Sequence, residues 1–197
     1  MTLTTHNPIR LDSRAEWLDG VRRVASPNQD ERPDNTEIAL LVIHGISLPP
    51  GEFGGGFIDQ LFINNLNPHD HPYFAEIADT RVSTHILIDR AGMITQFVPF
   101  NKRAWHAGVS EFRDRKHCND FSLGVELEGC DDQPYTDQQY KQLAAVTMVL
   151  MKQWPVITRD NIVGHCHIAP GRKTDPGPNF DWRYYFDLLD MADQETQ

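Results

Sequence analysis

The sequence predicts a single layered domain of the α/β or α+β class, in which strands alternate with helices. Three observations support this prediction. The chain has 197 residues, a length typical of one domain with its own core. Its composition of 40% hydrophobic and 23% charged residues is ordinary for a globular protein and excludes disordered, collagen-like and coiled-coil chains. Segments with the two-residue period of strands also alternate along the chain with segments of helical period.

The first predicted elements are a buried strand and a short helix. The branched apolar run 38–43 is too short for a typical helix, so it predicts a strand that is buried on both faces and ends at His44 and Gly45. Residues 47–56 are rich in proline and glycine and predict a loop. The segment 57–66 carries apolar residues at helical spacing and predicts a helix.

The middle of the chain predicts a hairpin and then a third strand. Segments 82–88 and 94–98, with a turn at 90–92 between them, have the pattern of a hairpin. In 121–128 apolar and other residues alternate, which predicts a strand with two different faces. The face suited to line a cleft holds Ser122, Gly124, Glu126 and Glu128.

Two helices complete the predicted elements. Thr136 and Gln139 have the spacing of a capping box and precede apolar residues at helical spacing, so a helix is predicted from this point. A last helix is predicted from near Asp181, with an apolar stripe that includes Tyr185 and Leu189. The polar stretch before Ala15 is expected to be loosely held.

Charge and cysteine content limit the possible partners and compartment. The chain has 18 Lys and Arg against 28 Asp and Glu, a net charge of −10, which argues against a nucleic-acid or anionic-membrane surface. No segment approaches the ~18 apolar residues of a membrane helix, and the first residues lack the pattern of a secretory signal. Three cysteines without a CxxC pair predict free thiols. Together these features predict a cytoplasmic protein.

A possible metal site comes from residues far apart in the sequence. His44 follows a buried strand, and the loop 164–178 is rich in proline and glycine and contains His165 and Asp175. These three residues would supply two imidazoles and a carboxylate, which zinc accepts as ligands. The separation of ten residues between His165 and Asp175 matches no short zinc motif. Two rival pairs therefore stay open, His165 with His167, whose rings would point the same way on extended backbone, and His69 with His71.

Acid and base chemistry also has candidates. Glu126 and Glu128 could act as a carboxylate pair, or they could form a solvated strand face, and periodicity cannot choose between them because they point the same way. Lys173 lies two residues before Asp175 and would place a cation beside a metal, or it is a surface lysine. His106 is equally consistent with a cleft and a structural position.

Several long segments resemble one known family over most of the chain. The segments are HGISLPPGEFGG (44–55), RAWHAGVSEF (103–112), CNDFSLGVELEG (118–129) and GHCHIAPGRKTDPGPNFDW (164–182). They are similar, in the same order, to the AmpD-type N-acetylmuramoyl-L-alanine amidases. The resemblance implies a cytosolic zinc enzyme that cleaves the amide between 1,6-anhydro-N-acetylmuramic acid and L-alanine during recycling of cell-wall peptidoglycan.

The same resemblance implies an architecture and a partner. It implies a single α/β domain with a central mixed β-sheet flanked by helices, and an anhydro-muropeptide as the substrate, with no protein partner evident. Because the likeness begins near Trp17 and ends at Trp182, we expect an N-terminal extension at 1–16, the amidase domain at 17–190 and a C-terminal tail at 191–197.

Position by position, the resemblance also implies roles for single residues. The sequence departs from the family at two positions. Gly45 stands where the family frequently has an asparagine, and His167 stands where an aspartate is common. We expect His167 to lie beside the metal rather than to bind it. The implied zinc ligands are His44, His165 and Asp175, the catalytic residues Glu126 and Lys173, and the substrate contacts Arg81 and Trp105.

Three other functions compete with this interpretation. A muropeptide-binding module without catalysis would lack part of the metal and catalytic set, all of which is retained here. An amidase acting on intact cell wall would need export or release, and often wall-binding modules, for which the sequence shows no pattern. A structural zinc protein would need a fourth ligand to close the site, and His167 is the candidate for it.

Overall fold

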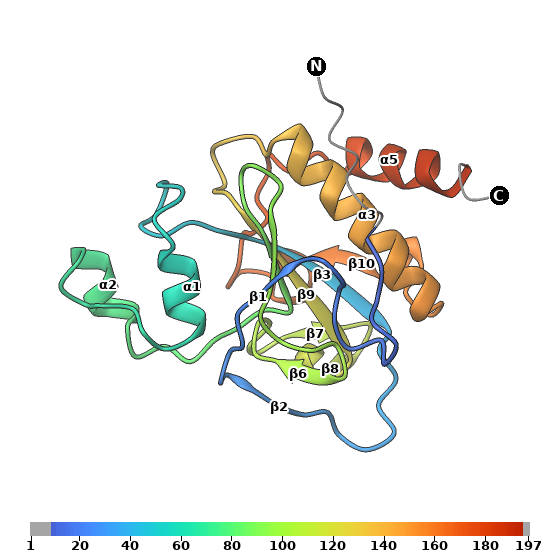
Figure 1. Cartoon of the computed structure of the whole chain (residues 1–197), viewed down its shortest axis with the longest axis horizontal. Helices are drawn as coiled ribbons and strands as arrows, with labels where there is room; N and C mark the ends of the chain where they lie inside the picture. Colours follow the sequence, from blue (N-terminus) through green and yellow to red (C-terminus); the bar gives the residue numbers. More distant parts are fainter. Residues whose placement is uncertain (1–8, 195–197) are drawn as a thin grey trace.

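The computed structural model describes residues 9–194 and centres on a mixed six-stranded sheet of order β1-β5-β4-β9-β3-β10 (Figure 1). Strands β4, β9, β3 and β10 run parallel to one another, and β5 runs antiparallel to β4. Two small sheets pair β2 with β6 and β7 with β8. The strands are β1 (Arg22–Arg23), β2 (Gln29–Glu31), β3 (Leu40–Ile46), β4 (Ile86–Ile88), β5 (Ile94–Gln96), β6 (Lys102–Ala104), β7 (Glu111–Phe112), β8 (Arg115–Lys116), β9 (Ser122–Glu128) and β10 (Ile162–Gly164).

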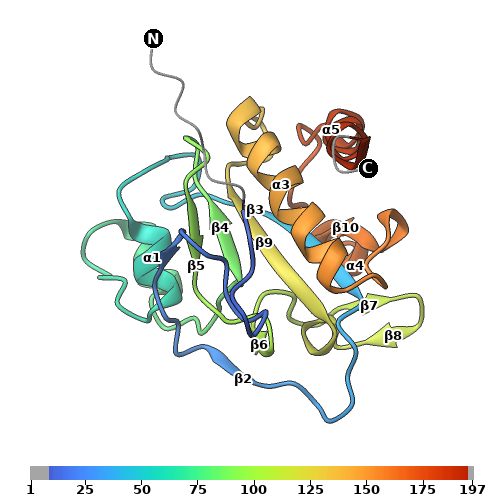
Figure 2. The ribbon, with the colours of Figure 1, turned by 45° about the vertical axis from the view of Figure 1, so that its right-hand side comes forward.

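Helices cover both faces of the sheet, as Figure 2 shows. The long helices α3 (Asp137–Gln153) and α5 (Trp182–Gln194) pack on one face, where the main apolar core lies. Helices α1 (Phe57–Phe62) and α2 (Pro72–Ile77) lie on the other side, over a second apolar cluster. A short helix, α4 (His165–Ile168), follows β10 directly. This mixed sheet flanked by helices confirms the predicted fold class.

The strongest sequence patterns are confirmed. In β9, Leu123, Val125 and Leu127 point into the main core, so the glutamates point to the opposite face. The capping box forms, because the Thr136 hydroxyl accepts from the Gln139 amide N–H at 3.2 Å and the Gln139 side chain accepts in return at 3.0 Å. These patterns hold because each side chain there has a partner within its own element or in the adjacent core.

Several boundaries differ from the prediction. The helix from Phe57 ends at Phe62, and the first hairpin strand begins only at Ile86. Before that strand the Ser83 and Thr84 hydroxyls bond to carbonyls of other segments, which replaces regular strand pairing. Helix α5 continues to Gln194, beyond the expected start of the tail at 191.

The N-terminal segment is packed against the core. Of the stretch expected to be loosely held, residues 1–8 lie outside the described part. The prediction is wrong for the rest, because Ile9 and Leu11 pack against the main core and Leu11 forms a β-bridge with Leu18. Within the described residues, no helix is long and apolar enough to span a membrane.

Candidate active site

Three parallel strands bring the candidate residues together at one edge of the sheet. The carboxyl ends of β9, β3 and β10 meet there, and His44 of β3 lies directly opposite Glu126 of β9. His165 is the first residue after β10, at the start of α4. Asp175 arrives from the following loop, which is tied to α4 by a hydrogen bond from the Cys166 N–H to the Asp175 carbonyl, at 2.9 Å. Sheet topology therefore assembles side chains that are up to 131 positions apart.

His44, His165 and Asp175 form a compact group of possible metal ligands. The Nδ1 atoms of His44 and His165 are 3.0 Å apart, and both lie 3.0–3.1 Å from Asp175 Oδ2. Both histidines are buried, with exposed fractions of 1% and 3%. Two imidazole nitrogens and one carboxylate oxygen converging on a point match a zinc site that keeps a fourth position open. In the described part of the chain, no other group of three or more such residues converges in this way.

The charge states of this group suit a cation. Burial lowers the pKa of His44 to about 4, although the neighbouring Asp175 opposes the shift. Burial would raise the pKa of Asp175, but hydrogen bonds from His165 and His44 hold it well below its usual range. At neutral pH the site therefore offers a neutral imidazole of His44, with one nitrogen lone pair free, and an ionised carboxylate, as metal binding requires.

The Nε2 atoms of His44 and His165 have partners of their own, so the Nδ1 atoms of both rings face the ligand group. His165 Nε2 lies 3.1 Å from the carbonyl oxygen of Ala107, which can only accept a hydrogen bond. The Arg172 guanidinium donates to the same oxygen at 2.6 Å. His44 Nε2 lies 2.9 Å from Nδ1 of His106. The contacts of Arg172 and His106 with this group join segments distant in sequence, so no local pattern predicted them.

The two glutamates of β9 have different surroundings. Both carboxylate oxygens of Glu128 accept from backbone amides, one from Gly54 at 2.6 Å and one from Arg90 at 3.2 Å. Glu126 Oε1 is 4.0 Å from His44 Nδ1, and its Oε2 is buried without a hydrogen-bond partner. Burial, and then the charge of Asp175, raises the pKa of Glu126 well above its ordinary value. Glu126 thus has a free, basic oxygen beside the ligand group, whereas Glu128 holds loops in place.

The cleft in front of this group has a volume of about 610 Å³, and Glu126, His165, Lys173 and Asp175 line it. Lys173 is exposed at its mouth. Neither Arg81 nor Trp105 is among the lining residues. Arg81 is exposed and donates to the Ala78 carbonyl, while Trp105 is half-buried beside His106.

The rival histidine pairs do not form metal groups. Residues 165–168 are helical, so the extended backbone that would align His165 with His167 is absent. The Nδ1 atom of His167 instead accepts from the Gly164 N–H at 2.9 Å. The Nδ1 atom of His71 likewise accepts from the Tyr73 N–H, at the start of α2. Both rings therefore cap helices rather than face a common ion.

Tyr135 occupies the space beside Gly45. A Cβ atom at Gly45 would lie 2.2 Å from the Tyr135 hydroxyl oxygen, and one at Gly129 would lie 2.3 Å from the Tyr135 ring. The hydroxyl donates to the carbonyl of Pro176 at 2.8 Å, next to Asp175. Gly45 thus leaves room for a side chain that holds the Asp175 loop.

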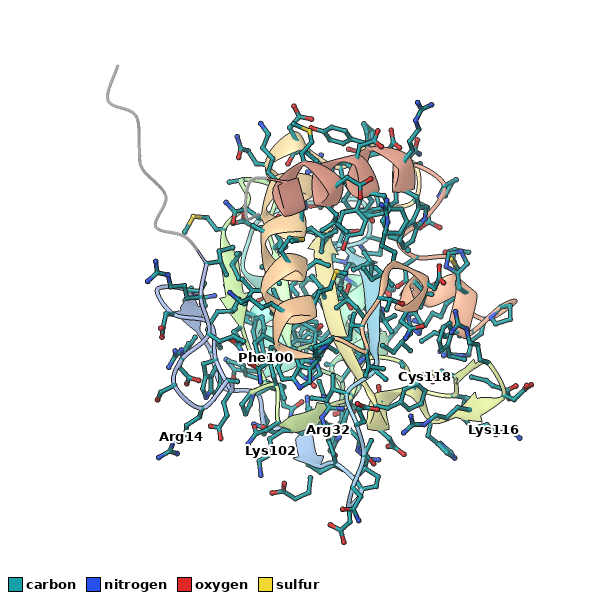
Figure 3. All side chains as sticks on the ribbon, turned by 90° about the vertical axis from the view of Figure 1, so that its right-hand side faces the viewer. Arg14, Arg32, Phe100, Lys102, Lys116 and Cys118 are labelled. Atoms are coloured by element: carbon teal, nitrogen blue, oxygen red, sulfur yellow. The ribbon has the colours of Figure 1, made fainter. Side chains whose placement is uncertain are left out.

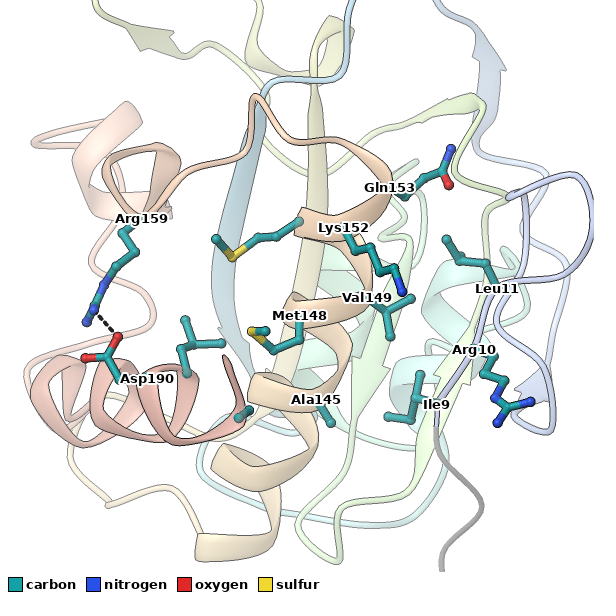
Figure 4. Close-up of a pocket in the computed structure, with 13 residues that line it drawn as sticks. Ile9, Arg10, Leu11, Ala145, Met148, Val149, Lys152, Gln153, Arg159 and Asp190 are labelled. Atoms are coloured by element: carbon teal, nitrogen blue, oxygen red, sulfur yellow. Dashed lines mark hydrogen bonds and ion pairs between the residues drawn. The ribbon is translucent and has the colours of Figure 1, made fainter. Parts of the chain in front are cut away.

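A larger cavity lies away from this site. Figure 4 shows it between the N-terminal segment, α3 and α5, with a volume of about 1180 Å³. Its walls are mainly apolar, and an ion pair between Arg159 and Asp190 lies at its edge. None of the predicted site residues lines it.

Comparisons with known proteins show the family to which the chain is similar. The sequence profile of the N-acetylmuramoyl-L-alanine amidase family matches residues 34–178. The 1,6-anhydro-N-acetylmuramyl-L-alanine amidase AmpD of Escherichia coli (strain K12) is 62% identical over 166 residues, covering 84% of this chain and 90% of that protein. A crystal structure of a selenomethionine derivative of AmpD superimposes with a TM-score of 0.87 at 59% identity, covering 91% of this chain and 98% of the other.

A more distant structure contains a ligand. It is the complex of the N-acetylmuramyl-L-alanine amidase AmiD from E. coli with the substrate anhydro-N-acetylmuramic acid-L-Ala-D-γ-Glu-L-Lys. Its TM-score is 0.57 at 27% identity, and the match covers 92% of this chain and 65% of that one.

Proposed function

This chain belongs to the N-acetylmuramoyl-L-alanine amidase family, and we propose that it hydrolyses the amide between 1,6-anhydro-N-acetylmuramic acid and L-alanine in muropeptides. The observation that carries the proposal is the convergence of two histidine Nδ1 atoms and an aspartate oxygen beside a buried glutamate oxygen without a partner. A metal site with an adjacent free base is one arrangement that activates water for amide hydrolysis. The retention of both parts argues against a module that only binds muropeptides.

His44, His165 and Asp175 would hold the metal, and zinc suits this donor set. When bound in such a site, zinc lowers the pKa of a bound water to ~7 and polarises a carbonyl oxygen. Three protein ligands leave a position open to solvent, which argues against a closed structural site. His167 accepts a hydrogen bond from the Gly164 N–H, so it would support the backbone beside His165 rather than bind the metal.

Glu126 would act as the general base and then the general acid. Its Oε2 would take a proton from the attacking water and pass it to the nitrogen of the departing L-alanine. A raised pKa suits this double role, because the carboxylate must hold the proton between the two steps. Glu128 cannot take this role while both of its oxygens are engaged with backbone amides.

Lys173 would stabilise the negative charge that develops on the scissile carbonyl oxygen. Its ammonium group is exposed at the cleft. A positioned donor of this kind contributes ~2.7–4 kcal/mol to transition-state stability. Arg81 and Trp105 would contact the sugar and peptide after adjustment of the exposed Arg81 side chain.

The proposed setting is recycling of wall fragments inside the cytoplasm, by an amidase domain that includes residues 17–190 and the adjoining residues packed with them. Its partner would be the anhydro-muropeptide alone, with no nucleic acid, membrane or protein. The net charge of −10 disfavours the first two, because it repels phosphate groups.

Mass spectrometry of an anhydro-muropeptide incubated with the purified protein tests the proposal. We expect release of the free peptide, loss of that release with a chelator, and recovery on adding zinc. Absence of release from a folded, zinc-loaded sample would refute the proposed activity. Comparing the rates of hydrolysis of the anhydro-muropeptide and of intact peptidoglycan distinguishes a recycling enzyme from one that acts on the wall.

A further inference from the structure

A row of buried polar side chains extends from the metal group into the sheet. His44 Nε2 is 2.9 Å from His106 Nδ1, and His106 Nε2 is 3.0 Å from the Ser122 hydroxyl oxygen. The exposed fractions of the three residues are 1%, 8% and 0%. Buried polar groups need partners, and an apolar residue could fill the same space without them. The row therefore calls for a physical reason beyond packing.

Counting protons along the row gives that reason. A neutral imidazole carries one proton, on one of its two nitrogens. If His44 Nδ1 gives its lone pair to a metal, the proton is on Nε2 and must be donated to His106 Nδ1. His106 then carries its own proton on Nε2 and donates it to Ser122. The opposite arrangement, with a proton on His106 Nδ1, would move the His44 proton to Nδ1 and block the metal.

The backbone around His106 is built to hold this ring. The amides of His106 and Ala107 both donate to the Asn119 side-chain oxygen, at 3.1 and 2.8 Å. The ring lies against Gly124, where a Cβ atom would come within 2.6 Å of it. The glycine in the middle of β9 thus leaves room for the imidazole, next to Ser122 on the same strand face.

We propose that His106, supported by Ser122, is a positioning residue that holds His44 in the tautomer and orientation that direct Nδ1 at the metal. The two candidate histidine ligands are then held in different ways. His165 is fixed by a carbonyl oxygen that can only accept, whereas His44 is fixed by a side chain that substitution can remove. The inference rests on the metal site of the proposed function.

Zinc affinity, measured by competition with a chromophoric chelator, tests this role. His106→Leu removes the acceptor, and we expect an about 10- to 100-fold weaker affinity, as for other partners of metal-bound histidines. His106→Asn is smaller than histidine but can place its Oδ1 near the position of Nδ1, so we expect it to restore most of the affinity. Circular dichroism establishes that each variant is folded.

His85→Asn is the matched control. His85 is also buried, and its ring centroid is 5.9 Å from that of His106. Its nitrogens face the Gly124 N–H, the Lys102 carbonyl and Arg32, but no candidate metal ligand. Arg32 is labelled in Figure 3. We expect the zinc affinity of His85→Asn to equal that of the wild type.

The outcomes separate this inference from the metal site itself. Failure of the wild type to bind zinc would refute the site and the inference together. Equal zinc affinity in the wild type and a folded His106→Leu would refute the inference alone. If His106→Leu does not fold, the nitrogen-15 NMR shifts of histidines in the zinc-loaded wild type decide. We expect His106 to be protonated at Nε2, and protonation at Nδ1 would overturn the inference.

Discussion

Glu126→Gln and Glu128→Gln form a matched pair of substitutions on one strand face. The two glutamates are buried to a similar extent, with exposed fractions of 8% and 6%, and lie two residues apart in β9. They differ in their partners. Glu126 Oε2 has none, whereas both oxygens of Glu128 accept from backbone amides. The same change at the two positions should therefore separate catalysis from stability.

The expected magnitudes follow from these partners. Glu126→Gln removes a general base and should lower kcat by about 10²–10⁴-fold, while zinc content and stability are retained. Glu128→Gln keeps one accepting oxygen, but its NH₂ group cannot accept from the second amide. Loss of one hydrogen bond to a charged group costs about 1.5–3 kcal/mol. For a chain of this length that corresponds to a decrease in Tm of roughly 3–12 °C.

Three measurements on each variant check this prediction. They are kcat for release of the peptide from an anhydro-muropeptide, bound zinc by elemental analysis, and Tm. An intact kcat in a zinc-loaded Glu126→Gln would remove Glu126 from the mechanism. A larger loss of kcat in Glu128→Gln than in Glu126→Gln would refute the assignment of the two roles.

Three further substitutions test the surroundings of the site. Lys173→Met should lower kcat by about 10²–10³-fold with zinc retained, and unchanged turnover would exclude its role at the oxyanion. Asp175→Ala should lose bound zinc, whereas full occupancy would indicate another ligand such as His167. Burial lowers the pKa of His85 well below its ordinary value, so below pH ~6.5 the unfolded chain binds a proton that the folded protein excludes, and stability falls with pH. At pH 5.5 this one histidine should cost up to about 1.4 kcal/mol, the limit set by an unfolded pKa of ~6.5. His85→Asn should lose that much less stability than the wild type between pH 7.5 and 5.5 in urea titrations, and equal losses would contradict the reasoning.

The fold could be predicted where a pattern is repeated within one element. Strands β3 and β9 and helices α3 and α5 each carry a period or a cap over several residues, and all were found near their predicted positions. Strands β1, β2 and β6 have two or three residues each, too few to show a period. Helix α4 has four residues, and its local sequence did not distinguish one helical turn from extended backbone.

The site could be predicted in its residue types but not in its contacts. The sequence indicated the two histidines and the aspartate as possible metal ligands, and the two glutamates as possible acid or base groups. The choice between Glu126 and Glu128 depends on which one lies opposite His44, and that is set by the register of β3 against β9. The contact of His44 with His106 spans 62 positions and depends on the space left by Gly124. Register and space between elements are tertiary properties, which a single sequence does not show.

The different partners of Glu126 and Glu128 in β9 also relate the central sheet to the loops of the cleft. His44 and Glu126 sit on strands of the central sheet and His165 directly after one, where side chains are held most firmly, while Asp175 lies in the loop after α4. The cleft walls include part of the 47–56 loop, the ends of α1 and α2, and the loops around 129–131 and 172–175. Glu128 links the central sheet to the surrounding loops. Its carboxylate accepts hydrogen bonds from the backbone amides of Gly54 in the 47–56 loop and of Arg90 in the β4–β5 turn. Substitutions in the loop should therefore alter substrate preference without loss of zinc, as long as Glu128 keeps both amides.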